Sequence, residues 1–281
     1  MSGRDSSSKI IQLPIAHSVD FLQAGGHRLE YQKHLPSGLS EADAASRPAL
    51  VFLHEGLGSV ALWKQFPRQV AESAGCTALV YSRYGYGKSD TLQAPRSVDY
   101  MHREALDVLP EVLDRLGIDN PILVGHSDGA SIALIHAGSG IRPVRGIVAL
   151  APHVFVEDIT LKSIAEAGET FRTTDLPERL GRYHDDVASA FRGWNDIWLH
   201  PDFRRWNIEE FLPGIRCPVL VIQGEDDEYG SAAQVGAIAR HASGTVEILM
   251  LADCAHSPHQ AQKDATLEAI VKFTAGMTGS P

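Results

Sequence analysis

Short apolar segments recur along the chain, and most of them are nearly continuous in hydrophobic residues. Continuous apolar runs are typical of strands that are covered on both faces, as in a parallel sheet between two layers of helices. Helical patterns fill most of the sequence between the runs, so the chain is predicted to be an α/β protein with a doubly wound sheet. The predicted strands are Ala49–Leu53, Thr77–Tyr81, Ile122–Val124, Ile147–Leu150, Val219–Ile222 and Val246–Met250.

One alternating segment and two helical segments complete the pattern. Polar and apolar residues alternate within Ala16–Leu35 around Gly25-Gly26, which predicts a hairpin at an antiparallel edge of the sheet. A helix is expected between Asp99 and Gly117, where Pro110 predicts a kink or a break. A last helix is expected from about Ser257 to Thr274.

One connection is too long for a single crossover helix. About 70 residues separate Leu150 from Val219, and they include three of the four tryptophans. We interpret residues 154–207 as an inserted helical cap, and residues 1–153 and 208–281 as the core of the protein.

Composition narrows the class of protein. The 281 residues are 44% hydrophobic and 21% charged, which is typical of a globular chain. The net charge of -10 argues against a nucleic-acid partner or an anionic membrane. The polar segment Met1–Lys9 has no apolar region after it, and no stretch is long and apolar enough to span a membrane. We therefore expect a cytoplasmic protein with a small-molecule partner, either alone or as a homodimer.

The three cysteines indicate neither a disulfide framework nor a zinc ribbon. Their number is odd and their spacing is wide, so buried free thiols are expected at Cys76, Cys217 and Cys254. The 13 histidines do not form a pair with the spacing of metal ligands in a coherent site. No metal and no organic cofactor is expected.

The strongest motif is Gly125-His126-Ser127-Asp128-Gly129, a Gly-x-Ser-x-Gly sequence. Such a sequence often occurs by chance, but here an apolar strand precedes it and a helical pattern follows it. A sharp turn from strand to helix strains the serine backbone and leaves no room for larger flanking residues. Ser127 is therefore a candidate nucleophile, and an acid and then a histidine must follow it along the chain.

Two later loops supply the partners. The acidic run Glu225–Glu228 follows a predicted strand, and Asp227 is favoured as the triad acid, with Asp226 as the alternative. His256 follows the last predicted strand and precedes the helix that begins near Pro258, so it is favoured as the base over His259.

An acyl-transfer site also needs donors for a developing oxyanion. The backbone N–H of Asp128 is one candidate. The second is expected in the loop after the first predicted strand, at Gly56, with Glu55 or Leu57 as alternatives. His54, in the same loop, is expected to hold the loop by hydrogen bonds rather than to react.

Substrate-binding residues are predicted where the core meets the cap. His153 directly follows a predicted strand, and Trp194 and Trp198 lie four residues apart, on one face of a helix. The tryptophans either pack the cap onto the core or line an apolar acyl pocket.

These motifs resemble the α/β-hydrolase fold family from Ala16 to the final helix. Residues 54–58 resemble the family's His-Gly-x-x-Gly oxyanion loop, with Glu55 where glycine is usual. Residues 81–90 resemble its Asp-x-Arg-Gly-x-Gly-x-Ser segment, with Ser82 and Tyr84 replacing Asp and Arg. Residues 254–259 are similar to its Gly-His-Ser-Pro-His pattern, with Ala255 for glycine.

The resemblance implies an eight-stranded, mostly parallel sheet with the catalytic residues on loops at its carboxyl edge. It also implies a serine esterase-like enzyme, since Gly-x-Ser-Asp-Gly is similar to the motif of serine esterases that act on small esters. Ester, thioester or lactone hydrolysis is expected, with hydrolysis of an amide or a C–C bond, or perhydrolysis, as alternatives.

Two other classes of function compete with this interpretation. Gly56, Gly58 and Ala61 formally satisfy a dinucleotide fingerprint, but an NADP-binding oxidoreductase would leave the serine motif unexplained. A ligand-binding protein without turnover is the second alternative, since a fold does not guarantee its chemistry.

Overall fold

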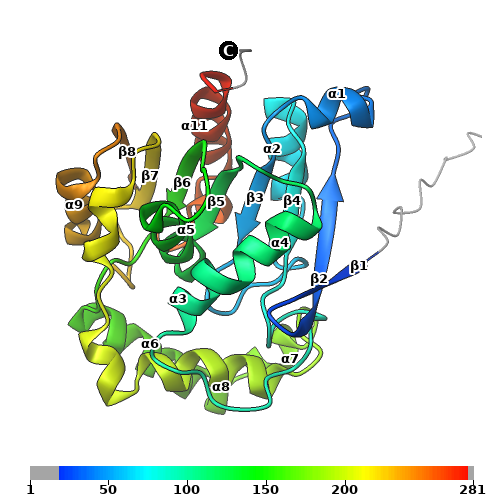
Figure 1. Cartoon of the computed structure of the whole chain (residues 1–281). Helices are drawn as coiled ribbons and strands as arrows, with labels where there is room; N and C mark the ends of the chain where they lie inside the picture. Colours follow the sequence, from blue (N-terminus) through cyan, green and yellow to red (C-terminus); the bar gives the residue numbers. More distant parts are fainter. Residues whose placement is uncertain (1–18, 278–281) are drawn as a thin grey trace, which may run out of the picture.

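The structure, a computed structural model, describes residues 19–277 (Figure 1). The segment Met1–Lys9 and the start of the predicted hairpin at Ala16 lie outside the described residues. Eight strands form a sheet in the order β1-β2-β4-β3-β5-β6-β7-β8. The strands are β1 (Asp20–Ala24), β2 (His27–His34), β3 (Leu50–Leu53), β4 (Ala78–Tyr81), β5 (Ile122–His126), β6 (Gly146–Leu150), β7 (Val219–Gly224) and β8 (Val246–Leu251).

The hairpin β1–β2 forms the antiparallel edge of the sheet. The other six strands, β4, β3, β5, β6, β7 and β8 in spatial order, pair in parallel. This confirms the predicted α/β class and the eight-stranded, mostly parallel sheet. Strand β8 lies at the opposite edge, where Ile248 is 47% exposed. Only Leu251 of this strand is buried, so helices do not cover both of its faces as they cover those of the central strands.

Alternating residues of the central strands enter two separate cores. Leu50 and Phe52 belong to a core with helices α2 (Phe66–Ala74) and α11 (Lys263–Ala275). Val51 and Leu53 belong to the core on the opposite face. Helices cover both faces, which is why these strands are apolar at every position. The second core includes residues of α3 (Tyr100–Arg103), α4 (Leu109–Arg115), α5 (Asp128–Ser139) and α9 (Ala232–His241).

The helix expected between Asp99 and Gly117 is one helical run with a wide turn in its middle. A π-helical segment, η1 (Glu104–Val108), joins α3 to α4, and the Leu109 N–H donates to the Glu104 carbonyl. Pro110 falls in the first turn of α4, where its missing N–H costs least. The proline is thus accommodated by the wide turn and does not break the run.

The last predicted helix, about 257–274, is two helices. A short helix α10 (Pro258–Ala261) ends at Gln262, whose backbone leaves the helical region before α11 begins. The Gln262 side chain donates to the carbonyl of Ala252, 3.1 Å away. This break lets α10 bury His259 while α11 packs against the sheet.

The long connection between β6 and β7 is mainly helical. Phe155 and Asn207 form an antiparallel bridge, so the chain enters and leaves this segment side by side. Figure 1 shows α6, α7 and α8 together at the end of the sheet toward which β3 points. The elements of the connection are α6 (Asp158–Thr173), α7 (Leu176–Leu180), α8 (Val187–Trp198), η2 (Pro201–Arg205) and η3 (Glu209–Gly214). Elsewhere, α1 spans Glu41–Ala45, and none of the helices within residues 19–277 is long and apolar enough to cross a membrane.

Helix α5 begins in close contact with the ends of β3 and β5. A Cβ atom at Gly129 would lie 2.0 Å from the Leu53 carbonyl oxygen. A Cβ atom at Gly125 would lie 2.3 Å from the Gly129 carbonyl oxygen. Both contacts are with backbone, which cannot move aside as a flexible side chain can. The two glycines of the motif are therefore required by the approach of the helix to the sheet.

We predict that Gly129→Ala will destabilise the protein by about 3 kcal/mol or more, because the added methyl group overlaps the β3 backbone. Urea unfolding measures this change. Gly276→Ala is the matched control, since a Cβ atom there would lie 3.7 Å from its nearest neighbour, in ordinary contact. Equal stability of the two variants would contradict the prediction.

Candidate active site

Ser127 lies at the turn between β5 and α5. Its φ of 52° and ψ of -117° are sparsely populated by residues other than glycine. The strained turn is held by its neighbours: the Ser127 N–H donates to the Leu150 carbonyl at 2.9 Å, and Ala130 N–H donates to the Ser127 carbonyl at 2.9 Å. The hydroxyl is thus presented at the carboxyl edge of the sheet, at the N-terminus of α5.

The structure brings together Ser127, His256 and Asp227. His256 Nε2 is 2.9 Å from Ser127 Oγ, and His256 Nδ1 is 2.8 Å from Asp227 Oδ1. The carboxylate can only accept, so Nδ1 carries the proton and Nε2 is free to accept the serine proton. This is the arrangement of a nucleophile, a general base and an orienting acid.

Asp227, and not Asp226, is the carboxylate at this position. Its Oδ1 also accepts from the backbone N–H of Tyr229 at 2.9 Å and of Gly230 at 3.3 Å. Burial raises the pKa of Asp227, but the hydrogen bond and charge of His256 and the hydrogen bond from Tyr229 N–H lower it by more, so the net pKa lies below the ordinary value. Asp226 is exposed. The carboxylate of Asp227 is therefore ionised and buried behind the histidine.

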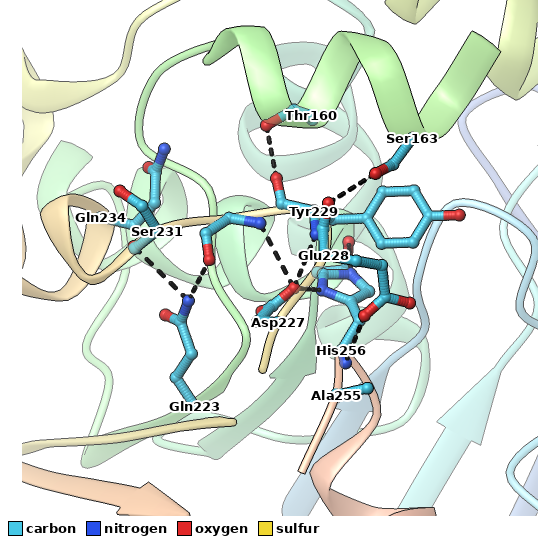
Figure 2. Close-up of polar contacts among 12 residues, drawn as sticks. Thr160, Ser163, Gln223, Asp227, Glu228, Tyr229, Ser231, Gln234, Ala255 and His256 are labelled. Carbon is cyan, nitrogen blue, oxygen red and sulfur yellow. Dashed lines mark hydrogen bonds and ion pairs between the residues drawn. The ribbon is translucent and has the colours of Figure 1, made fainter. Parts of the chain in front are cut away.

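The loop that carries Asp227 is held from two sides (Figure 2). Thr160 and Ser163, on α6, donate from their hydroxyl groups to the carbonyls of Tyr229 and Glu228. From the sheet side, the Gln223 amide donates to the Gly230 carbonyl at 2.7 Å. The position of the acid thus depends on a helix of the connection between β6 and β7.

The predicted oxyanion loop follows β3. His54 Nε2 accepts from the Arg83 N–H at 3.0 Å, which requires the proton to be on Nδ1. Nδ1 lies 2.7 Å from the Glu55 carbonyl and donates to it. His54 therefore holds the loop and has no free nitrogen for chemistry, as the sequence suggested. Within residues 19–277, the backbone N–H groups of Gly56 and Asp128 donate to no acceptor, which leaves both available.

Two residues that the sequence did not single out also hold this loop. The Arg83 guanidinium is buried and donates to the Glu55 carbonyl at 2.9 Å and to the His54 carbonyl at 3.2 Å. His184 accepts from Gly87 N–H at its Nδ1, so its Nε2 donates to the Leu57 carbonyl, 2.9 Å away. His184 lies in no recognisable motif. Arg83 lies within residues 81–90, but no pattern in the sequence links either residue to residues 54–58.

The side chain of Asp128 is fully buried and joins the nucleophile turn to its surroundings. It accepts from the Tyr100 hydroxyl at 2.7 Å and from Trp198 Nε1 at 3.2 Å. Arg83 Nη2 lies 3.6 Å from the same carboxylate and balances its charge. Trp198 is only 1% exposed, so much of its role is to anchor α8 to this turn.

Glu55 occupies a position where the resembled family has glycine, and it forms an ion pair beside the nucleophile. Its Oε2 lies 3.4 Å from Nδ1 of the buried His126. Burial opposes both charges, but the two partners overcome it: the pKa of Glu55 lies well below its ordinary value, and that of His126 is raised. His126 Nε2 lies 2.8 Å from the His256 carbonyl and donates to it. The His126 ring thus connects the loop of residues 54–58, the turn at Ser127 and the loop that carries His256.

A cavity of about 190 Å³ opens onto Ser127 and His256. All three predicted substrate-binding residues line it, together with Gly56 of the predicted oxyanion loop. Trp194 lies against this loop, since a Cβ atom at Gly56 would lie 2.1 Å from the indole ring. The cavity contains carboxylates and aromatic rings but no Lys or Arg among its described lining residues. They are Glu55, Gly56, Leu57, His126, Ser127, His153, Thr160, Ile164, Trp194, Trp198, Glu228, Tyr229, His256 and Ser257.

Other candidate features do not form sites. Helix α2 begins only at Phe66, so the glycines after β3 do not open a helix as a dinucleotide fingerprint requires. His259 lies behind the site, with its ring 4.7 Å from that of Trp63. The cysteines are free, and Cys217 is only partly buried, contrary to expectation. Within the described part of the chain, no group of three or more His, Cys, Asp or Glu side chains is arranged to hold a metal ion.

Comparison with known families agrees with this architecture. A sequence model of the alpha/beta hydrolase family matches residues 50–269, well over half of the chain. The chain therefore belongs to the α/β-hydrolase family.

Individual relatives are more distant. Human serine hydrolase BPHL is 25% identical over 174 residues, which are 60% of this chain and 60% of the relative. A proline iminopeptidase of Lactobacillus delbrueckii subsp. lactis is 31% identical over 111 residues, 37% of this chain and 38% of the relative. The 2-(acetamidomethylene)succinate hydrolase of Mesorhizobium japonicum is 24% identical over 259 residues, 84% of this chain and 91% of the relative. The chain thus spans less than two thirds of the length of the first two relatives.

Solved structures share the fold. VinJ has a TM-score of 0.71 at 21% identity, with 92% of this chain and 98% of that chain covered. The enol-lactonase from Burkholderia xenovorans LB400 has a TM-score of 0.70 at 18% identity, with 90% and 99% covered. At these identities the likeness extends to the fold alone.

We predict that Glu55→Gln will lower the free energy of unfolding by about 3 kcal/mol near pH 6, because it leaves a buried imidazolium without its counterion. The pair stabilises the fold above the ordinary glutamate pKa of 4.5, and this stabilisation is lost as pH falls through the depressed pKa of Glu55. It is also lost as pH rises above 6.5 through the raised pKa of His126. The difference between wild type and variant should therefore be smaller at about pH 9.

Urea unfolding at the two pH values tests this. Asp226→Asn, which removes an exposed carboxylate, is the control and should show no such dependence. A loss of stability in Glu55→Gln that is the same at both pH values would contradict an ion pair.

Proposed function

We propose that this protein is a serine hydrolase that cleaves a small ester, thioester or lactone through an acyl-enzyme intermediate. The observation that carries the proposal is the pair of contacts of His256, 2.9 Å from Ser127 Oγ and 2.8 Å from Asp227 Oδ1. Support also comes from the name of one relative, a serine hydrolase.

In the proposed reaction, Ser127 Oγ attacks the acyl carbon while its proton passes to His256 Nε2. The negative charge that develops on the carbonyl oxygen is stabilised by the backbone N–H groups of Gly56 and Asp128. The bond to the leaving group then breaks, and His256 returns the proton to that group. A water molecule attacks the acyl-enzyme in the same way, its proton passes through His256, and Ser127 is regenerated. These steps use only side chains, backbone amides and water.

The ionised Asp227 has two tasks in this scheme. It fixes the tautomer of His256, and it stabilises the imidazolium that forms in each transition state. The segment 154–207 acts as the cap of the site in this proposal: it contributes Trp194 and Trp198 to the cavity and supports the acid loop through α6. The small cavity favours short acyl groups, since sites for drug-sized ligands measure about 300–1,000 Å³.

Hydrolysis of a C–C bond, or perhydrolysis, would use the same three residues and stays an alternative. An esterase is preferred because an ester or lactone needs only the groups already described. A binding protein without turnover is disfavoured, because it would have no need of a strained Ser127 within 2.9 Å of a free imidazole nitrogen.

We predict that Ser127→Ala will abolish hydrolysis of p-nitrophenyl acetate, because it removes the hydroxyl that lies 2.9 Å from His256 Nε2. Steady-state assays of the purified variant measure the loss, and a fluorophosphonate probe should label wild type but not the variant. Full turnover in Ser127→Ala would exclude the proposed nucleophile.

We predict that Asp227→Asn will reduce kcat by about 10⁴-fold, because an amide reverses the tautomer of His256. Asp226→Asn, one residue away and exposed, should retain wild-type kcat. The same assay applied to both variants decides between the two candidate acids, and the opposite ranking would assign the role to Asp226.

We predict that Trp194→Ala will shift the preference of the enzyme toward longer acyl chains, because it removes an apolar ring from the wall of the cavity. The ratio of kcat/KM for p-nitrophenyl octanoate to that for p-nitrophenyl acetate should rise by about tenfold. The control is Trp206→Ala, which removes a buried indole that does not line the cavity. If Trp194→Ala lowers Tm but leaves the ratio unchanged, Trp194 serves packing alone.

A further inference from the structure

His153 is a buried histidine that the proposed reaction does not use. It follows β6, and its side chain is 2% exposed. Its backbone is fixed, because its carbonyl accepts from the Ser131 hydroxyl at 2.6 Å and the next N–H, of Val154, donates to Gln234 Oε1 at 2.7 Å. The ring is therefore presented from a rigid part of the site.

The ring lies between the cap and the base. Its centroid is 5.2 Å from that of Trp198, in an edge-on arrangement, and 5.6 Å from that of His256. On another side it faces Gly230, where an added Cβ atom would lie 3.4 Å from His153 Cε1. His153 also lines the cavity that contains Ser127.

Neither ring nitrogen of His153 has a hydrogen-bond partner within residues 19–277, and Nδ1 is fully buried. The other buried histidines of the described chain each have at least one ring contact of this kind, namely His54, His126, His136, His184 and His259. A buried polar group without a partner is costly and needs an explanation. Because the ring borders the cavity, a molecule bound there is the natural source of the missing partner.

The chemistry of that partner follows from the charge of the ring and of the cavity. Burial, followed by the nearby His256, lowers the pKa of His153 to about 3, so the imidazole is neutral at physiological pH. A neutral imidazole offers one donor and one acceptor, which suits a hydroxyl or a carbonyl group. In the cavity Glu55 is already paired with His126, Glu228 adds a carboxylate, and no Lys or Arg is among its described lining residues, so a substrate carboxylate would lack a cationic partner.

We propose that His153 is a specificity-determining residue that forms a hydrogen bond with an uncharged hydroxyl or carbonyl group of the substrate, next to the bond that is cleaved. The substrate class is thus a small ester or lactone with a neutral polar substituent near the reacting carbonyl. This inference rests on the proposed hydrolase function.

Matched substrates test the proposal. On the acyl side, p-nitrophenyl 3-hydroxybutanoate is compared with p-nitrophenyl butanoate, and p-nitrophenyl hydrogen succinate adds a carboxylate. On the alcohol side, 2-hydroxyethyl butanoate is compared with propyl butanoate. We expect wild type to prefer the hydroxylated member of at least one pair by about tenfold in kcat/KM, and to disfavour the succinate.

His153→Leu should bring the preferred ratio close to one, because leucine can neither donate nor accept a hydrogen bond. His153→Asn, which retains a donor and an acceptor, should keep part of the preference. His102→Asn is the control, because His102 lies outside the cavity and should leave every ratio unchanged. No preference in wild type, or the same preference in His153→Leu, would overturn the proposal.

A binding measurement separates this proposal from the hydrolase function itself. Calorimetry with Ser127→Ala gives the dissociation constants of the same ester pairs without turnover. The role of His153 is supported if Ser127→Ala binds the hydroxylated ester more tightly and the double variant Ser127→Ala, His153→Leu does not. This result would hold even if wild type cleaves none of these esters. Equal dissociation constants in both backgrounds would refute it even if wild type is an active esterase.

Discussion

The close approach of α5 to the ends of β3 and β5 is the constraint on which the site depends. It is permitted only because residues 125 and 129 lack a Cβ atom. It holds Ser127 in a strained conformation and directs the first amides of α5 toward the same point. The next residue, Asp128, then turns its carboxylate into the protein, where Arg83 balances its charge. One turn therefore supplies the candidate nucleophile, a candidate oxyanion donor and an anchor for the surrounding elements.

Charged side chains hold the loops of the candidate site in position relative to one another. Arg83 lies beside Asp128 and also donates to the carbonyls of the candidate oxyanion loop, so this loop and the turn at Ser127 share a single cation. His126 connects Glu55 to the carbonyl of His256, so the same loop is also joined to the base. In a buried site such pairs are costly to break, because removal of one partner leaves the other without solvation. Glu55, at a position where glycine is usual in the family, thus has a structural partner in His126.

The connection between β6 and β7 does more than cover the site. Its Thr160 and Ser163 hold the loop of the candidate acid, its His184 holds the candidate oxyanion loop, and its Trp198 reaches the turn of the candidate nucleophile. The residues that shape the cavity are therefore mechanically tied to those that carry the proposed chemistry. His153, at the start of the connection, lies between the same two groups of residues, with its ring facing both Trp198 and His256.

The sequence by itself determined the α/β class, the central strands and the Gly-x-Ser-x-Gly turn, because these depend on local periodicity and on sterics between neighbouring residues. It also indicated Asp227 and His256 by their place after strands, although only the hydrogen bonds chose Asp227 over Asp226. The tertiary structure decided the wide turn before Pro110, the break at Gln262, and the roles of Arg83 and His184. These features depend on contacts between segments far apart in the chain, and a buried hydrogen bond between such segments leaves no periodic pattern in either of them.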